Sequence, residues 1–256
     1  MKNYFDLKGD VAVVTGGSSG LGVQFAKALA NQGADIALVA RREEKLKNVK
    51  KEIEEKYDVR VEYYTADVTD PDKVAEVILN IENDFGKIDI LVNNAGLGLT
   101  AATTEFSNEN WLKMMDININ GVFYVAREVG KVMLKHKYGR IINIGSLHSS
   151  VVMKYGALNA YATTKGAVRM LTKALATEWA LEGITVNAIG PAYFESEMTE
   201  AVIGDDSFLQ ILKAYCPMER AGKEGELDTT LLYFASKFST YTTGQLVTVD
   251  GGWTAI

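Results

Sequence analysis

Short, almost uninterrupted apolar segments alternate along the chain with longer segments whose apolar residues recur every three or four positions. The short segments are rich in β-branched residues and predict seven strands, at 11–14, 36–39, 61–64, 88–92, 140–144, 184–188 and 245–249. Because most of these strands are apolar at consecutive positions, both of their faces are expected to be covered, as in a parallel sheet between two layers of helices.

The longer segments predict helices. Asp70 and Pro71 are of the types that favour an N-cap and a first helical position, so a helix is expected to begin there and to run to about Phe85. Further helices are expected at 20–32, 43–56, 108–137 (with a break near Asn118) and 161–181. No linker or repeat divides the sequence, so this alternation predicts a single α/β domain over residues 1–256. Its doubly wound parallel sheet would bind ligands beyond the C-terminal ends of the strands.

Composition narrows the functions that such a fold can have. The 256 residues carry a formal net charge of −6, which provides no excess positive field for phosphates, so neither nucleic acid nor a membrane is an expected partner. A single cysteine, Cys216, excludes an intrachain disulfide, and with only two histidines no metal site is expected. The polar N-terminal residues lack a signal-peptide pattern, so the protein is expected to be cytoplasmic.

A glycine-rich turn, residues 15–22, follows the first predicted strand and reads Thr-Gly-Gly-Ser-Ser-Gly-Leu-Gly. Glycine lets the backbone approach a phosphate closely, and the helix that follows offers free N–H groups and the positive end of its dipole. A turn that binds nothing is the alternative for this motif taken alone. The binding interpretation predicts a cofactor phosphate site at Gly16, Ser18, Ser19, Gly20, Leu21 and Gly22.

Further motifs follow in a fixed order along the chain. They are Asn93-Asn94-Ala95-Gly96 after the fourth strand, Asn118 three residues before Gly121, Ser146 at the end of the fifth strand, Tyr161-x-x-x-Lys165, and Asp250-Gly251-Gly252. Together with the glycine turn, they make the whole chain resemble the short-chain dehydrogenase/reductase family in its single-domain branch. The resemblance implies a Rossmann-like fold, a nicotinamide cofactor, and interconversion of a secondary alcohol and a ketone.

Tyr161 and Lys165 are one helical turn apart, so their side chains are expected on the same face. A neighbouring ammonium would lower the pKa of the phenol and let Tyr161 exchange a proton with the alcohol oxygen. The resemblance implies that Ser146 bonds that oxygen, that Lys165 also holds the nicotinamide ribose, and that Asn118 anchors a water that relays protons. The alternatives are a half-exposed tyrosine with a solvated lysine, and a helix-capping or kink-stabilising role for Asn118.

The end of the second strand bears on the choice between NADP and NAD. Ala40 stands where NAD-binding relatives carry an aspartate, and Arg41 follows it, so a guanidinium is available for a 2′-phosphate and no carboxylate repels it. NADP(H) is therefore favoured, with NAD(H) as the alternative. Arg42 is a second candidate for this site, although of the two arginines it is the one expected to be an ordinary surface residue.

The resemblance assigns the remaining cofactor contacts. Asp67 and Val68 would meet the adenine, with an ordinary Asp turn as the alternative. Asn94, Ala95 and Gly96 would pass close to the adenosine ribose. The loop that would hold the nicotinamide departs from the family pattern, since Ala192 stands in place of glycine. Its expected contacts are Pro191, Phe194 and Ser196.

Substrate specificity is expected from residues 147–160, from the loop after Leu97, and from residues 193–218. Candidate substrate contacts are His148, Tyr155 and Tyr193, although a lone loop histidine is more often a surface residue. Residues 194–217 are amphipathic, and they predict either a helical lid over the site or a static helix pair.

Residues 190–199 resemble the gluconate 5-dehydrogenase subgroup, which suggests a sugar acid such as gluconate and 5-ketogluconate. The alternatives are a 3-oxoacyl thioester, a hydroxysteroid or bile-acid ketone, and a non-catalytic NADP-binding sensor. The resemblance also implies a homotetramer with contacts through the helices at 108–137 and 161–181. Met170 and Ala176 would serve that interface or pack on the sheet.

Overall fold

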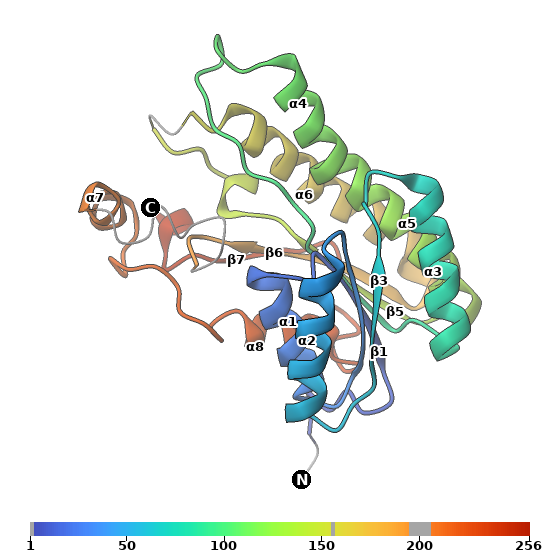
Figure 1. Cartoon of the computed structure of the whole chain (residues 1–256). Coiled ribbons are helices and arrows are strands. Elements are labelled where there is room, and N and C mark those ends of the chain that lie inside the picture. The colour runs from blue at the N-terminus through green and yellow to red at the C-terminus, as the bar shows by residue number, and fades with distance from the viewer. Residues whose placement is uncertain (1–2, 155–156, 195–205) are drawn as a thin grey trace.

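A computed structural model describes residues 3–154, 157–194 and 206–256, and its centre is one seven-stranded sheet (Figure 1). The strand order is β3-β2-β1-β4-β5-β6-β7, and every neighbouring pair is parallel. The strands are β1 (Val11–Thr15), β2 (Asp35–Ala40), β3 (Val61–Thr65), β4 (Ile90–Asn93), β5 (Gly139–Ile144), β6 (Ile184–Pro191) and β7 (Leu246–Val249). The predicted doubly wound parallel sheet is confirmed.

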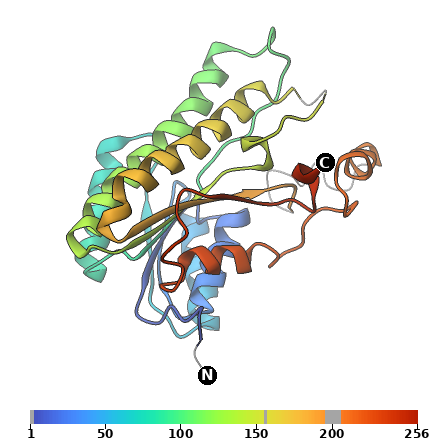
Figure 2. The same cartoon turned by 180° about the vertical axis from the view of Figure 1, so that it is seen from behind.

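Helices cover both faces of the sheet (Figures 1 and 2). One face packs against α1 (Gly20–Ala30), α2 (Glu43–Lys56) and α8 (Asp228–Ala235), and the other against α3 (Pro71–Phe85), α5 (Val122–His136) and α6 (Asn159–Trp179). Each layer forms its own apolar core with the sheet, which explains why the strands are apolar on both sides. The sheet order reverses between β1 and β4, and in such folds the ligand crevice opens at that point.

The sequence signals for helix ends are confirmed at several positions. The Asp70 side chain accepts hydrogen bonds from the backbone N–H groups of Asp72 and Lys73, and α3 ends at Gly86 with φ of 80°. The expected break near Asn118 is a π-helical turn, η1 (Asp116–Gly121), between α4 (Asn108–Met115) and α5.

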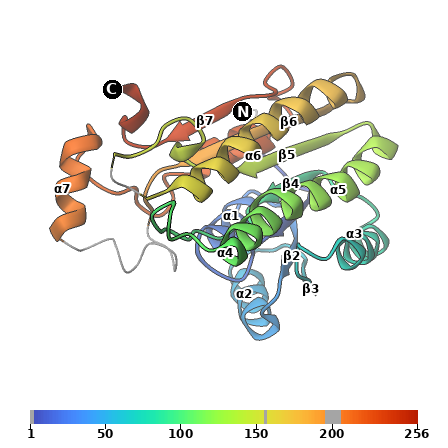
Figure 3. The same cartoon turned by 90° about the horizontal axis from the view of Figure 1, so that it is seen from above.

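Two helices depart from the expectations. α6 begins two residues before the predicted Tyr161, and α8 was not predicted at all. Within the amphipathic region 194–217, the described part forms α7 (Asp206–Tyr215), which stands beyond the end of the sheet beside the C-terminus (Figure 3). The choice between a lid and a static helix pair depends in part on residues 195–205, which lie outside the described residues.

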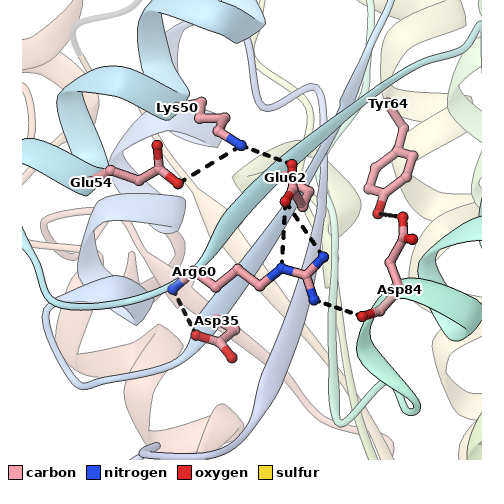
Figure 4. Close-up of polar contacts among 7 residues, drawn as sticks. All are labelled: Asp35, Lys50, Glu54, Arg60, Glu62, Tyr64 and Asp84. Carbon is pink, nitrogen blue, oxygen red and sulfur yellow. Dashed lines mark hydrogen bonds and ion pairs between the residues drawn. The ribbon is translucent and has the colours of Figure 1, made fainter.

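A polar network covers the edge strand β3 (Figure 4). The Arg60 guanidinium contacts Glu62 on β3 and donates to the Asp84 carbonyl oxygen at 2.6 Å, at the end of α3. Lys50 on α2 reaches Glu62 at 2.8 Å, and the Tyr64 hydroxyl donates to the Asp84 carboxylate at 2.6 Å. Charged side chains thus occupy the exposed edge, where an unpaired strand would otherwise invite pairing with another chain.

Within the described residues, no helix is both long and apolar enough to cross a membrane. In the same part of the chain, no group of three or more histidine, cysteine, aspartate or glutamate side chains is placed to hold a metal ion. Cys216 is a buried free thiol.

Candidate active site

A cleft of about 800 Å³ opens at the C-terminal ends of the strands. The glycine turn, the ends of β2 to β6 and the first turn of α6 contribute its lining. Most of the site residues predicted from sequence line this cleft, namely Gly16, Ser18, Ser19, Gly20, Leu21, Arg41, Arg42, Asp67, Val68, Asn94, Ala95, Gly96, Ser146, His148, Tyr161, Lys165, Pro191, Tyr193 and Phe194. Gly22 and Asn118 lie behind the lining, while Tyr155 and Ser196 lie outside the described residues.

The glycine turn is tightly packed against its own backbone and the loop after β4, while its approach to a phosphate stays a prediction. Gly16 has φ of 67°, and a Cβ added to Gly22 would lie 2.3 Å from the Gly16 carbonyl oxygen. Only glycine fits at both positions without displacing the backbone. α1 begins at Gly20, so its first N–H groups face the same cleft.

Thr15 is a residue of the site that sequence analysis did not single out. Its hydroxyl oxygen accepts hydrogen bonds from the backbone N–H groups of Asn94 and Ala95, at 2.9 and 3.1 Å. The Asn94 amide also donates to the Thr15 carbonyl oxygen at 3.0 Å. These bonds fix the loop after β4 against the glycine turn. The sequence did contain a signal for this role, since Thr15 is the threonine that opens the glycine-rich turn at residues 15–22.

The two arginines at the end of β2 have different surroundings. Arg41 forms an ion pair with Asp67 at 3.6 Å. The Arg42 guanidinium donates to the Ser19 hydroxyl at 2.6 Å and to the Ser18 hydroxyl at 3.4 Å, so it reaches across to the glycine turn. Arg42 is exposed, as expected of a surface residue, but its side chain also lines the cleft, so both arginines stay candidates for the 2′-phosphate.

Asp67 forms the Asp turn that the sequence left open as the alternative, and its contact with adenine stays a prediction. Its carboxylate accepts hydrogen bonds from the backbone N–H and the hydroxyl of Thr69, at 3.0 and 2.9 Å, which is an Asp turn. It also lines the cleft. Burial opposes ionisation of this carboxyl, but the bonds from Thr69 and the charge of Arg41 outweigh it and lower its pKa.

Ser146 sits where β5 ends, in a tight turn, η2 (Leu147–Ser149). Its hydroxyl oxygen accepts a hydrogen bond from the His148 backbone N–H at 3.1 Å, and its own N–H donates to the Ser149 hydroxyl at 3.1 Å. The turn therefore holds the side chain in place and leaves the hydroxyl proton available for donation into the cleft.

Tyr161 lies in the first turn of α6 and lines the same cleft. Burial raises the pKa of the phenol, and the hydrogen bond with Ser146 opposes this shift only in part. The net lowering of this pKa that the sequence predicts is not seen, because burial dominates; the Lys165 ammonium donates to the Ile144 carbonyl oxygen. A raised pKa keeps the phenol protonated at neutral pH, the form that can donate a proton to a ketone oxygen.

Lys165 is 6% exposed, and its ammonium donates to the Ile144 carbonyl oxygen at 2.8 Å. Burial lowers its pKa from the usual 10.5 to about 8. The ammonium lies 5.7 Å from the centre of the Tyr161 ring, on the same face of α6, as the spacing predicts. The alternative of a solvated lysine is excluded.

Asn118 lies in the π-helical turn and is 1% exposed. Its carboxamide accepts from the Leu97 N–H and donates to the Leu97 carbonyl oxygen, both at 2.8 Å, and it donates to the Thr164 hydroxyl at 3.0 Å. The side chain thus joins the loop after β4 to α6, one residue before Lys165. These three bonds go to other segments and not to its own helix, so they support neither helix capping nor kink stabilisation, and the proton-relay role stays a prediction.

The outer part of the cleft is aromatic. Tyr193 packs against Phe208 of α7 at a ring-centre distance of 4.7 Å and against Trp253 at 5.5 Å. His148 is 5% exposed and lies between Tyr161 and Tyr193, with ring-centre distances of 6.2 and 6.4 Å. The general expectation that a lone loop histidine is a surface residue was therefore wrong here, because the η2 turn folds the side chain inward.

The comparisons with known proteins agree with this geometry. A family model described as enoyl-(acyl carrier protein) reductase matches residues 16–254. The chain is 38% identical to gluconate 5-dehydrogenase of Gluconobacter oxydans (strain 621H) and 36% identical to galactitol 2-dehydrogenase of Rhizobium johnstonii. Each alignment covers 98% of this chain and 97% of the relative. The crystal structure of a gluconate 5-dehydrogenase from Burkholderia cenocepacia in complex with NADP and tartrate is 37% identical, with a TM-score of 0.94 over 99% of this chain and 98% of the other.

Proposed function

This chain belongs to the short-chain dehydrogenase/reductase family, and from that premise we propose that it interconverts a polyhydroxylated ketone and its secondary alcohol with NADP(H). The observation that carries the proposal is the convergence of Ser146, Tyr161 and Lys165 on one cleft that also contains the glycine turn. An isolated tyrosine–lysine pair would not specify this chemistry. The same pair beside a serine hydroxyl and a phosphate-binding turn does.

A nicotinamide dinucleotide fits the residues that are present. The backbone of the glycine turn and the first residues of α1 line one end of the cleft, which continues from there to Lys165. The dinucleotide, when bound, supplies the hydride acceptor or donor. Its phosphates would be held by the glycine turn and its nicotinamide ribose by Lys165.

We favour NADP(H) over NAD(H). Arg41 and Arg42 both line the cleft at the end of β2, where the adenosine ribose of a dinucleotide lies in this fold. The Arg42 contacts with Ser18 and Ser19 bring a second positive charge beside the glycine turn. The related gluconate 5-dehydrogenase structure contains NADP.

The chain's own residues would carry out the proton chemistry. The Ser146 hydroxyl is held by the hydrogen bond that it accepts from the His148 N–H, and its own proton would be donated to the substrate oxygen and orient it. Tyr161 would give its phenolic proton to that oxygen during ketone reduction and take it back during alcohol oxidation. Lys165, fixed on the Ile144 carbonyl, would keep positive charge near the phenol as it ionises.

We propose a substrate with several hydroxyl groups, such as a sugar acid of the gluconate and 5-ketogluconate type. The curated relatives act on gluconate and galactitol, which share that chemistry. The walls of the outer cleft add tyrosine and histidine groups that can bond hydroxyls.

We also propose a homotetramer. Trp111 and Leu112 on α4, Phe123 on α5 and Met170 on α6 are exposed by 39% to 63%, and these helices lie side by side on one face (Figure 3). Large apolar side chains exposed on neighbouring helices are typical of an interface. Ala176 of α6, by contrast, is buried in the core between this helix and the sheet, which supports packing on the sheet as its role. Light scattering on the purified protein would measure the mass of the assembly.

The test is an NADPH-oxidation assay with 5-keto-D-gluconate, a steroid ketone and an acetoacetyl thioester. We expect turnover of the polyhydroxylated ketone and a loss of about 100- to 10,000-fold in kcat for Tyr161→Phe, since only the proton donor is removed. NADPH binding, followed by its fluorescence, should be unchanged in that variant. Tyr57→Phe, at the end of α2 and away from the cleft, is the matched control.

The possible results separate the alternatives. If the protein preferred the thioester or the steroid, the proposed polyhydroxylated substrate would be wrong, but the assignment as a ketone reductase would stand. NADPH binding with no turnover of any ketone would favour the non-catalytic sensor. Near-normal activity of Tyr161→Phe would refute the assignment of Tyr161 as the proton donor.

A further inference from the structure

His148 is a buried imidazole that the proposed proton chemistry does not use. Its backbone N–H holds Ser146, but its side chain has a separate set of contacts. The ring is 5% exposed, lines the cleft, and lies edge-on to the rings of Tyr161 and Tyr193. It is therefore placed next to the phenol that would meet the reacting oxygen.

The hydrogen bond at one nitrogen decides what the other nitrogen can do. Nδ1 lies 3.1 Å from the Val151 carbonyl oxygen, and a carbonyl oxygen can only accept, so Nδ1 carries the proton. Burial lowers the pKa of the imidazole, more than the bond to Val151 raises it, so the ring is neutral near pH 7. In a neutral ring with Nδ1 protonated, Nε2 is a hydrogen-bond acceptor.

That acceptor has no partner among the described residues. Nε2 is buried, and no backbone or side-chain donor in the described part of the chain bonds to it. A buried acceptor without a donor loses its hydration and gains no hydrogen bond in return, so such a group is costly to keep unless a ligand satisfies it. Because Nδ1 turns toward Val151, Nε2 lies on the opposite side of the ring, away from that carbonyl.

We propose that His148 Nε2 is a specificity-determining acceptor for a substrate hydroxyl close to the reacting carbon. This inference rests on the proposed function and narrows its substrate class. An acceptor beside Tyr161 favours a ketone that carries an O–H group close to its carbonyl, and it leaves a plain ketone or an acyl thioester without a matching donor. The same geometry disfavours a carboxylate at this position, because an acceptor and an anion repel each other.

Two substitutions separate the two nitrogens of His148. The amide nitrogen of asparagine can take the place of Nδ1 and keep the bond to Val151, but it supplies no acceptor at Nε2. The longer glutamine can present its carbonyl oxygen near the Nε2 position and loses the Val151 bond. His148→Asn and His148→Gln therefore form a matched pair of similar polarity. Because the asparagine variant keeps the bond to Val151, a loss of activity in it cannot be attributed to disruption of the turn.

The kinetic test compares kcat/KM of both variants for 5-keto-D-gluconate and for 2-butanone, which has no hydroxyl. We expect His148→Asn to lose about tenfold or more in kcat/KM on 5-keto-D-gluconate, chiefly through KM, and His148→Gln to lose clearly less. The low activity on 2-butanone should change little in either variant. Equal losses in the two variants, or equal losses on the two ketones, would overturn the proposal.

A second measurement reads the imidazole directly. The chain has only two histidines, so ¹⁵N-histidine labelling of a His136→Gln variant leaves the single His148 signal. We expect a protonated Nδ1 and an unprotonated Nε2. With NADPH present and turnover blocked by Tyr161→Phe, adding 5-keto-D-gluconate should shift Nε2 in the direction of hydrogen bonding. A protonated Nε2, or no shift despite saturating ketone, would contradict the proposal.

Two controls keep the outcomes distinct. If Tyr193→Phe alone moved the Nε2 signal before any ketone was added, Tyr193 would already be its donor, and the proposal would be wrong. If the wild-type protein reduced no ketone, the proposed function would fail and this inference with it. Normal turnover with an unresponsive Nε2 would refute the His148 inference alone.

Discussion

The ammonium group of Lys165 lies 2.8 Å from the carbonyl oxygen of Ile144, at the point where β5 ends. This bond joins α6 to the sheet inside the cleft, and because the pKa of this nearly buried lysine is lowered only to about 8, it stays mostly protonated at neutral pH. The bond also means that the ammonium is fixed by the strand rather than by the phenol one helical turn away. Tyr161 and Lys165 are thus positioned independently, one through the Ser146 turn and the other through β5.

The first prediction concerns cofactor choice. We expect Arg42→Ala to weaken NADPH binding by about tenfold to a hundredfold and to leave NADH binding nearly unchanged, because in the proposed complex the guanidinium would form a charge-assisted bond to the 2′-phosphate. Arg41→Ala should act in the same direction but less strongly, because its guanidinium is shared with Asp67 at 3.6 Å. Fluorescence titration of both cofactors measures the effect.

Lys51→Ala, on the exposed face of α2, is the control for a general loss of positive charge. Equal losses for NADPH and NADH in both arginine variants would remove the case for NADP.

The second prediction concerns Asn118. We expect Asn118→Ala to lower the melting temperature and to remove most of the activity. The Leu97 N–H, the Leu97 carbonyl oxygen and the Thr164 hydroxyl would each lose a hydrogen-bond partner. Each buried polar group left without a partner costs about 1–3 kcal/mol of stability. Thr164→Val removes only one of these bonds and should cost less. A melting temperature unchanged in Asn118→Ala would show that the π-helical turn holds the loop without this side chain.

The positions of the strands, the helix ends and most cleft residues could be predicted because they depend on local rules. The Asp70-Pro71 start of α3 and the apolar strand pattern are of this kind. The side-chain directions of Arg42 and His148 could not, because they depend on contacts with residues 23 positions away and on the path of the η2 turn. The short helix α8 was missed because its apolar residues follow no clear helical period and it is fixed by packing on α1 and β5.

The third prediction concerns the glycine turn. We expect Gly22→Ala to abolish binding of either dinucleotide, because its Cβ would lie 2.3 Å from the Gly16 carbonyl oxygen and the turn must open to admit it. Gly166→Ala, on α6, adds a methyl group with no heavy atom within 4 Å and should leave binding intact. Calorimetry with NADPH and circular dichroism would separate loss of binding from loss of fold. Unchanged NADPH affinity in Gly22→Ala would show that the phosphates bind elsewhere.

The fourth prediction concerns Asp10, at the opposite end of the sheet from the cleft. Burial, and then the nearby Asp89 carboxylate, raise the pKa of this carboxyl from 3.8 to about 6, and its Oδ2 has no partner among the described residues. An acid whose pKa is higher in the folded state destabilises the fold once it ionises, so this penalty grows between about pH 4 and pH 6 and is complete above that range.

Asp10→Asn should therefore raise the free energy of unfolding at pH 8 by on the order of 1 kcal/mol, an amount reduced by the partial exposure of the group, and by much less at pH 4. Urea unfolding at the two pH values measures the difference, with the exposed Asp58→Asn as the control for a simple change of net charge. A variant less stable than the wild type at pH 8 would mean that the ionised carboxylate contributes favourably through Lys87, Lys237 and Arg140, whose charges lower its pKa.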